Sequence, residues 1–122
     1  MSTDLDLMQG AWDIKTLVVD GNEMPSGMLQ GSRIVVQGNA FTTTVMGKRL
    51  SVGTAVIDET ANPRTFDLTF TDGMHIGQKS LAIYEFNGET WHVCIGLAGK
   101  PRPTAFVSTK DSGHALETLT RA

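Results

Sequence analysis

The sequence is poor in several kinds of residue, and each shortage argues against a class of protein. Its single cysteine, Cys94, excludes a disulfide within the chain. Charged residues make up 19% of the 122 residues, below the about 25% of an average domain. Because Lys and Arg are scattered and the net charge is −3, nucleic acid is a poor candidate partner. No apolar run approaches the roughly 18 residues of a membrane span.

Motifs for catalysis and cofactor binding are missing as well. The chain contains no Gly-x-Ser-x-Gly elbow, no phosphate-binding loop, no dinucleotide fingerprint and no His or Cys pair at metal-ligand spacing. We therefore expect no cofactor and no metal. The first eight residues carry Asp4 and Asp6 and have neither the basic nor the apolar region of a signal peptide. Cytoplasmic residence is the resulting expectation.

Glycine, in contrast, is abundant, and it separates segments of alternating apolar and polar residues. Gly38-Asn39 and Asn87-Gly88 are hairpin signals between two such segments. Strands are expected at 10–19, 32–37, 40–46, 49–58, 65–71, 79–86, 89–97 and 114–121. Strands at intervals of about ten residues, joined by short turns, favour a meander over crossovers. The sequence predicts a single all-β domain over 1–122, an eight-stranded antiparallel up-and-down β-barrel, with a short helical turn at 4–9.

The two ends of the chain carry residues that can close this barrel. Gly10-Ala11-Trp12 opens the first strand, and Arg121 ends the last strand. In the first strand Trp12, Ile14, Thr16 and Val18 alternate with Asp13, Lys15 and Leu17. If these strands pair, the guanidinium can lie flat on the indole, a contact of roughly 0.5–2 kcal/mol. Gly10 permits a tight bend into the strand.

These same residues carry a family resemblance. A Gly-x-Trp at the first strand with a late Arg resembles the lipocalin/calycin signature. The chain also resembles a bacterial family of small, uncharacterised lipocalin-like domains, known mainly from planctomycetes and proteobacteria. The segments that carry this second resemblance are 9–12, 66–73, 83–86, 94–97, 102–106, 113–114 and 119–121. The resemblance implies the barrel fold and no established activity. The absence of a clear C-terminal helix, of disulfides and of extra length departs from typical lipocalins.

An eight-stranded barrel is either filled by side chains or holds one small ligand. Our first hypothesis is a non-enzymatic binder of a small hydrophobic or amphipathic molecule. Its expected apolar wall consists of Phe41, Leu50, Val52, Phe66, Leu68, Phe70, Tyr84 and Trp91. Arg102, held between Pro101 and Pro103, or Tyr84 would fix a polar head. Arg102 could equally pin its own loop by bonding backbone carbonyls.

Two other hypotheses remain open at this point. One is a protein-interaction module with a side-chain-filled barrel, in which low charge and six methionines give an adhesive surface and a homodimer is an option. The other is a small enzyme using Glu85, His92 or His75. The loop at Met74-His75-Ile76 could cover the barrel mouth. Cys94 is expected to be a buried structural residue, and Trp91, Val93, Ile95 and Leu97 are the better candidates for the inward face of their strand.

Overall fold

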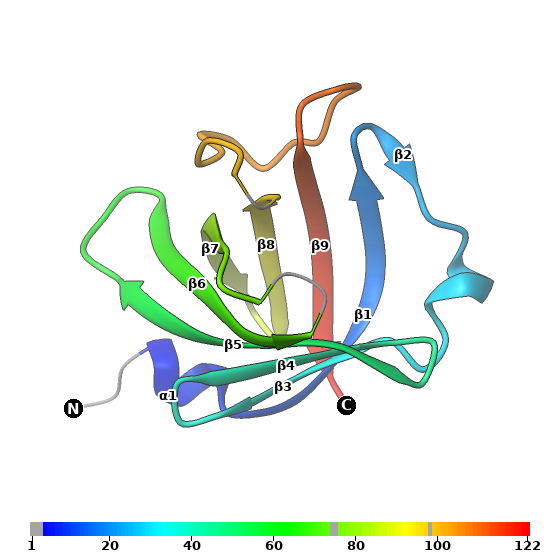
Figure 1. Cartoon of the computed structure of the whole chain (residues 1–122), viewed down its shortest axis with the longest axis horizontal. Helices are drawn as coiled ribbons and strands as arrows, with labels where there is room; N and C mark the ends of the chain where they lie inside the picture. The colour runs from blue at the N-terminus through cyan, green and yellow to red at the C-terminus, as the bar shows by residue number, and fades with distance from the viewer. Residues whose placement is uncertain (1–3, 74–75, 98) are drawn as a thin grey trace.

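The computed structural model describes residues 4–73, 76–97 and 99–122 and shows a closed antiparallel barrel (Figure 1). The elements in chain order are α1 (Asp4–Met8), β1 (Gly10–Val19), β2 (Asn22–Glu23), the 3-10 turn η1 (Ser26–Leu29), β3 (Arg33–Gln37), β4 (Ala40–Val45), β5 (Lys48–Asp58), β6 (Arg64–Gly73), β7 (Lys79–Asn87), β8 (Thr90–Gly96) and β9 (His114–Arg121). From β3 to β9 each strand pairs with the next, and β1 pairs with both β3 and β9. The predicted eight-stranded meander barrel is confirmed. The two-residue β2, which extends the sheet beside β1, was not predicted.

Closure of the barrel places Trp12 directly opposite Arg121 in the β1–β9 ladder. The Arg121 guanidinium carbon lies 4.3 Å from the centroid of the Trp12 ring. Its two terminal nitrogens donate hydrogen bonds to the carbonyl oxygens of Leu7 and Gln9. Gly10 has a φ of +108°, and a Cβ there would lie 3.2 Å from Arg121 Nη1. A glycine is therefore favoured at residue 10 both by the backbone conformation and by the arginine that crosses it.

A bulge in β1 changes which residues face inward. The pairing with β9 shifts between Ile14 and Thr16, so two residues of β1 stand against one of β9. As a result Leu17 and Val19 line the interior, whereas Thr16 is exposed. The alternation predicted from the sequence, with Thr16 and Val18 following Trp12 and Ile14, is wrong beyond the bulge, since an extra residue moves each later side chain to the other face. A second irregularity lies in the β5–β6 ladder, where the register shifts between Val52 and Gly53.

Aromatic side chains fill one end of the barrel. Trp12 and Trp91 make an edge contact with centroids 5.2 Å apart, and Phe86 stacks on Trp91 at 6.0 Å. Phe41 stacks on Phe66 at 5.8 Å and reaches Trp91 at 6.3 Å. Such pairs add about 0.5–1.5 kcal/mol each beyond the area that they bury. This end is therefore a packed core.

Helix α1 covers the same end, where the last strand also ends in Figure 1. Met8 is fully buried, and its carbonyl accepts a 2.8 Å hydrogen bond from Trp12 Nε1. Asp4 accepts hydrogen bonds from Tyr84 Oη at 2.7 Å and from Arg64 Nη1 at 2.9 Å. Within the described residues, no helix has both the length and the apolar character needed to cross a membrane.

Candidate functional site

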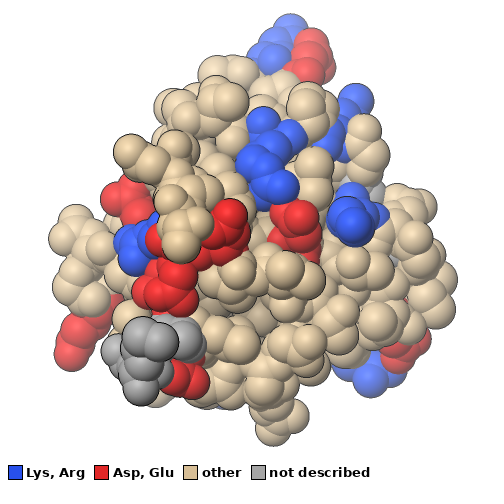
Figure 2. Space-filling view, turned by 90° about the vertical axis from the view of Figure 1, so that its left-hand side faces the viewer, with Lys and Arg blue, Asp and Glu red and all other residues tan. Residues whose placement is uncertain are grey.

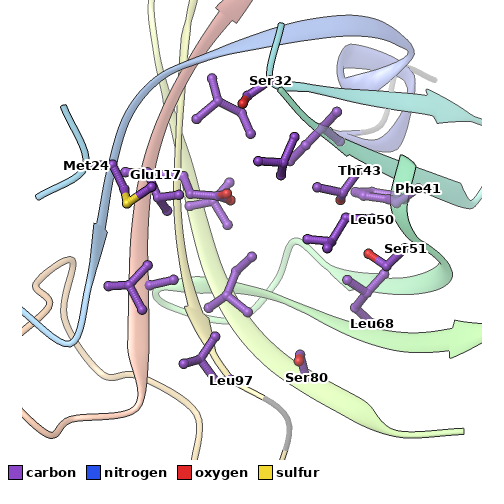
Figure 3. Close-up of a pocket in the computed structure, with 18 of the residues that line it drawn as sticks. Met24, Ser32, Phe41, Thr43, Leu50, Ser51, Leu68, Ser80, Leu97 and Glu117 are labelled. Carbon is purple, nitrogen blue, oxygen red and sulfur yellow. The ribbon is translucent and has the colours of Figure 1, made fainter. Parts of the chain in front are cut away.

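The other half of the barrel contains a cavity of about 210 Å³. Side chains of β1 and of β3 to β9 line it, together with Met24 and Leu29 from the segment between β1 and β3 (Figure 3). The apolar members are Ile14, Leu17, Val19, Met24, Leu29, Ile34, Phe41, Val45, Leu50, Phe66, Leu68, Phe70, Trp91, Val93, Ile95, Leu97 and Ala115. The barrel is thus filled by side chains at the α1 end and hollow beyond Trp91, which touches both parts.

Few polar side chains interrupt this wall. They are Ser32, Thr43, Ser51, Ser80 and Glu117. Among the described lining residues, Glu117 is the single one that can carry a charge. A mainly apolar pocket with a few polar groups is the usual composition of a small-molecule site.

Glu117 lies in the middle of β9, opposite Leu17 of β1 and Val93 of β8. The residue is 7% exposed, and its Oε2 has no hydrogen-bond partner among the described residues. In Figure 3 the end of its side chain is directed from β9 toward the middle of the ring of labelled residues. Burial raises the pKa of this carboxyl to about 7, because removal from water disfavours the charged form.

Trp91 supplies a second buried polar atom with no partner. Its side chain is fully buried, and Nε1 has no hydrogen-bond acceptor within the described part of the chain. Leu119 is its direct partner on β9, so Trp91 and Glu117 are diagonal neighbours on one face of the sheet. Buried polar groups are almost always hydrogen-bonded in folded proteins. Two such groups beside one apolar cavity distinguish this place from the rest of the described core.

The structure brings most of the predicted wall residues together. Phe41, Leu50, Phe66, Leu68, Phe70 and Trp91 all line the cavity. Val52 does not, because the sheet alternates and its neighbours Ser51 and Gly53 are the buried residues there. Trp91, Val93, Ile95 and Leu97 face inward together, as their pattern indicates.

Tyr84 and Arg102, which were predicted in the cavity wall, do not belong to it. Tyr84 points into the packed end, where its hydroxyl is bound to Asp4; burial and then this hydrogen bond raise the pKa of the phenol well above its ordinary range. Arg102 lies outside the barrel, where Nη1 donates to the carbonyl of Ala82 and Nη2 pairs with Asp67. It pins the loop after β8 against β7, the alternative that the sequence left open.

The residues considered for catalysis or metal binding are also placed apart from the cavity. Glu85 and His92 face each other across the outer surface of β7 and β8. Cys94 is buried under the loop after β8: its Sγ donates to the carbonyl of Val107, and burial raises its pKa. The described residues include no group of three His, Cys, Asp or Glu close enough to share a metal ion. The predictions about Met74 and His75 fall outside the described residues.

Glu117 is the site residue that the sequence analysis missed. A signal for it was present, because Arg121 was already expected to lie on the indole of Trp12, which fixes the face of the last strand that points inward. Counting back from Arg121 in steps of two places Leu119, Glu117 and Ala115 on the same inward face. An acidic residue between Leu and Ala on an inward face predicts a buried carboxyl group.

The face of the outer surface that Figure 2 shows has no comparable group of functional side chains. There, basic side chains are scattered and interspersed with acidic and uncharged ones. Exposed large apolar residues, such as Val56, Ile76 and Met46, come from different strands and loops of the described chain. Scattered apolar residues of this kind are normal on a protein surface. The barrel interior is the candidate functional site, because there an apolar cavity lies beside buried polar atoms without a hydrogen-bond partner.

Known proteins add no further information about this site. No family model, no curated protein sequence and no solved structure matches the chain.

Proposed function

We propose that the protein is a non-enzymatic binder that takes one small, mainly apolar molecule into the barrel cavity. The observation that carries this proposal is a cavity of about 210 Å³, lined by apolar side chains and by one buried carboxylate with an unpartnered oxygen. Proteins seldom leave voids of this size inside a close-packed core. The lipocalin-like resemblance of Gly10, Trp12 and Arg121 is in keeping with it, because lipocalin barrels hold one small ligand.

The volume sets the size of the molecule. An apolar cavity of about 150 Å³ holds benzene, and pockets for drug-sized ligands begin near 300 Å³. By this scale the cavity accommodates a molecule of roughly eight or nine non-hydrogen atoms. A long fatty acid or a sterol exceeds this size.

The test is a calorimetric titration with ethylbenzene, a neutral molecule of the right size, on native protein and on Ala115→Phe. Ala115 is 6% exposed and lines the cavity, so a phenyl ring there occupies the space of the ligand. Ala105→Phe places the same ring on an exposed loop and serves as the matched control. We expect native protein and Ala105→Phe to bind ethylbenzene equally and Ala115→Phe to lose at least about tenfold in affinity, the equivalent of about 1.4 kcal/mol.

A second blocking variant, Ser80→Leu, guards against misfolding of the first, since Ser80 lines the cavity from β7. Circular dichroism and thermal unfolding establish that each variant is folded. Absence of binding to the native protein, or equal binding by native protein and both folded blocking variants, contradicts the proposed function.

A further inference from the structure

The mainly apolar cavity contains one buried carboxyl group, that of Glu117, without a cation beside it among the described lining residues. Glu117 is more than nine-tenths buried, and none of the ion pairs or hydrogen bonds of the described residues satisfies its Oε2. The arginine on the same face, Arg121, lies over Trp12 and donates to backbone carbonyls of the segment before β1. A buried carboxylate without a cation is costly when it is ionised.

Other titratable groups near Glu117 lie on the outer side of the sheet. On β8, His92 and Cys94 alternate with the lining residues, and burial keeps the Cys94 thiol neutral by raising its pKa. On β1, Asp13 forms an ion pair with Arg33, and Lys15 is exposed. On β9 itself, His114 lies near the carbonyl of Pro101 outside the barrel. Across the cavity, the described lining residues of β3 to β7 and of the segment before β3 carry no ionisable side chain.

We propose that the cavity takes a small organic cation, an apolar molecule that ends in a protonated amine, with Glu117 as its counter-ion. This inference rests on the binding function proposed above and names the class of ligand. An ammonium group supplies both the opposite charge and the hydrogen-bond donors that the unpartnered carboxylate oxygen lacks. A carboxylate ligand would bring a second negative charge beside the first, and an alcohol would satisfy the hydrogen bond without balancing the charge.

The aromatic residues at the inner end of the cavity favour the same class. Trp91 is the diagonal neighbour of Glu117, within the reach of an aromatic side chain, and Phe41 contacts Trp91 and lines the cavity as well. Aromatic faces attract cations, tryptophan most strongly. An ammonium group on Glu117 therefore lies within reach of the aromatic rings of Trp91 and Phe41, while the apolar body of the ligand occupies the space between β4, β5 and β6.

The test compares three probes that share a phenyl ring and differ in the charge of the end group: phenethylamine, phenethyl alcohol and phenylacetate. Dissociation constants are measured by calorimetry at about pH 5.5 and about pH 8. The amine stays protonated throughout, whereas Glu117 changes from mostly protonated to mostly ionised over this range. We expect phenethylamine to bind at least about tenfold more tightly at the higher pH and to be the tightest of the three there. The alcohol should be nearly insensitive to pH, and phenylacetate the weakest.

Glu117→Gln removes the charge and keeps the shape, and Glu117→Met is a second variant for the case in which the first does not fold. In each folded variant we expect phenethylamine to lose at least about tenfold in affinity at the higher pH and to lose its pH dependence. Binding of the alcohol by the variants reports that the cavity is intact. Glu85→Gln, which makes the same change of net charge on the outer face, should leave all three affinities unchanged.

The outcomes separate the two proposals. Binding of the alcohol as tightly as the amine at the higher pH, or amine binding that folded Glu117 variants retain, overturns the cation assignment and leaves the binding function standing. Failure of all three probes to bind native protein overturns both.

Discussion

At the scale of single residues, Glu117 has the clearest expected effect on the pH dependence of stability, because the fold buries this acid away from water. Its pKa rises from an ordinary 4.5 to about 7, and burial is the cause. Between these two values the unfolded chain releases the Glu117 proton while the folded protein keeps it. The folded state then binds more protons, so this residue lowers stability as the pH rises from about 4.5 to 7, and its penalty is complete above that range.

Glu117→Gln should therefore change stability in a pH-dependent way. The difference in free energy of unfolding between the variant and the native protein is expected to grow by up to about 3 kcal/mol between pH 4.5 and pH 8. This value follows because a shift of one pKa unit corresponds to about 1.4 kcal/mol. Urea unfolding at several pH values measures it, with Glu85→Gln as the control for an acid on the outer face. A gain that is the same at all pH values would show that Glu117 ionises normally in the folded protein.

The residues that the sequence misassigned share a physical reason. The pattern of strand 79–86 correctly places Tyr84 inward, but the acceptor for its hydroxyl is Asp4, 80 residues away in sequence. Arg102 lies in a loop whose course over the outer face of β7 follows from packing. Alternation reports the face on which a side chain lies. It does not report the depth along the barrel or the partner from another element, and these two decide whether a residue lines a cavity.

At the scale of elements, the β1–β9 seam closes the barrel, and Arg121 ties this seam to the segment before β1. It combines the contact with Trp12 and the hydrogen bonds to two carbonyls before β1. Arg121→Ala should lower the free energy of unfolding by about 1–3 kcal/mol, because a cation–π contact and two charge-assisted hydrogen bonds are lost.

Arg49→Ala is the matched control. Arg49 is 64% exposed and pairs with an exposed Asp72, so its loss should cost less than about 1 kcal/mol. Chemical denaturation monitored by tryptophan fluorescence gives both values. Equal costs for the two substitutions would mean that the Trp12–Arg121 contact does not stabilise the seam.

The positions of the strands could be predicted from the sequence, because turn residues and the alternation of apolar and polar residues are short-range signals of where a strand begins and ends. The first and last strands have the predicted bounds, 10–19 and 114–121. The bulge within β1 could not be predicted from the sequence, because it depends on pairing with other strands. On one edge β1 pairs with β3 at its start and with β2 at its end, while the other edge pairs with β9. Which face Leu17 and Val19 occupy depends on that bulge, and so does part of the cavity wall.

At the scale of the whole molecule, the barrel has a packed half and a hollow half. Aromatic packing and helix α1 fill one end, and the remaining interior is a cavity in which Glu117 is the one acid among the described lining residues. Packing at the first end supplies stability, so the barrel can fold although its other half is hollow, and that half is the site of the proposed ligand. The hollow half could not be foreseen from composition, because the same apolar residues could have filled the barrel.

Methyl-resolved NMR during a titration with ethylbenzene tests the central claim most directly, because it locates the ligand. Leu68, Val93 and Ala115 line the cavity, whereas Val56 and Val107 are 73% and 53% exposed on the outside. The account predicts saturable shifts at the first three methyl-bearing residues and none at the other two. Shifts confined to the outer residues, or no shifts at saturating ligand, would contradict a binding site inside the barrel.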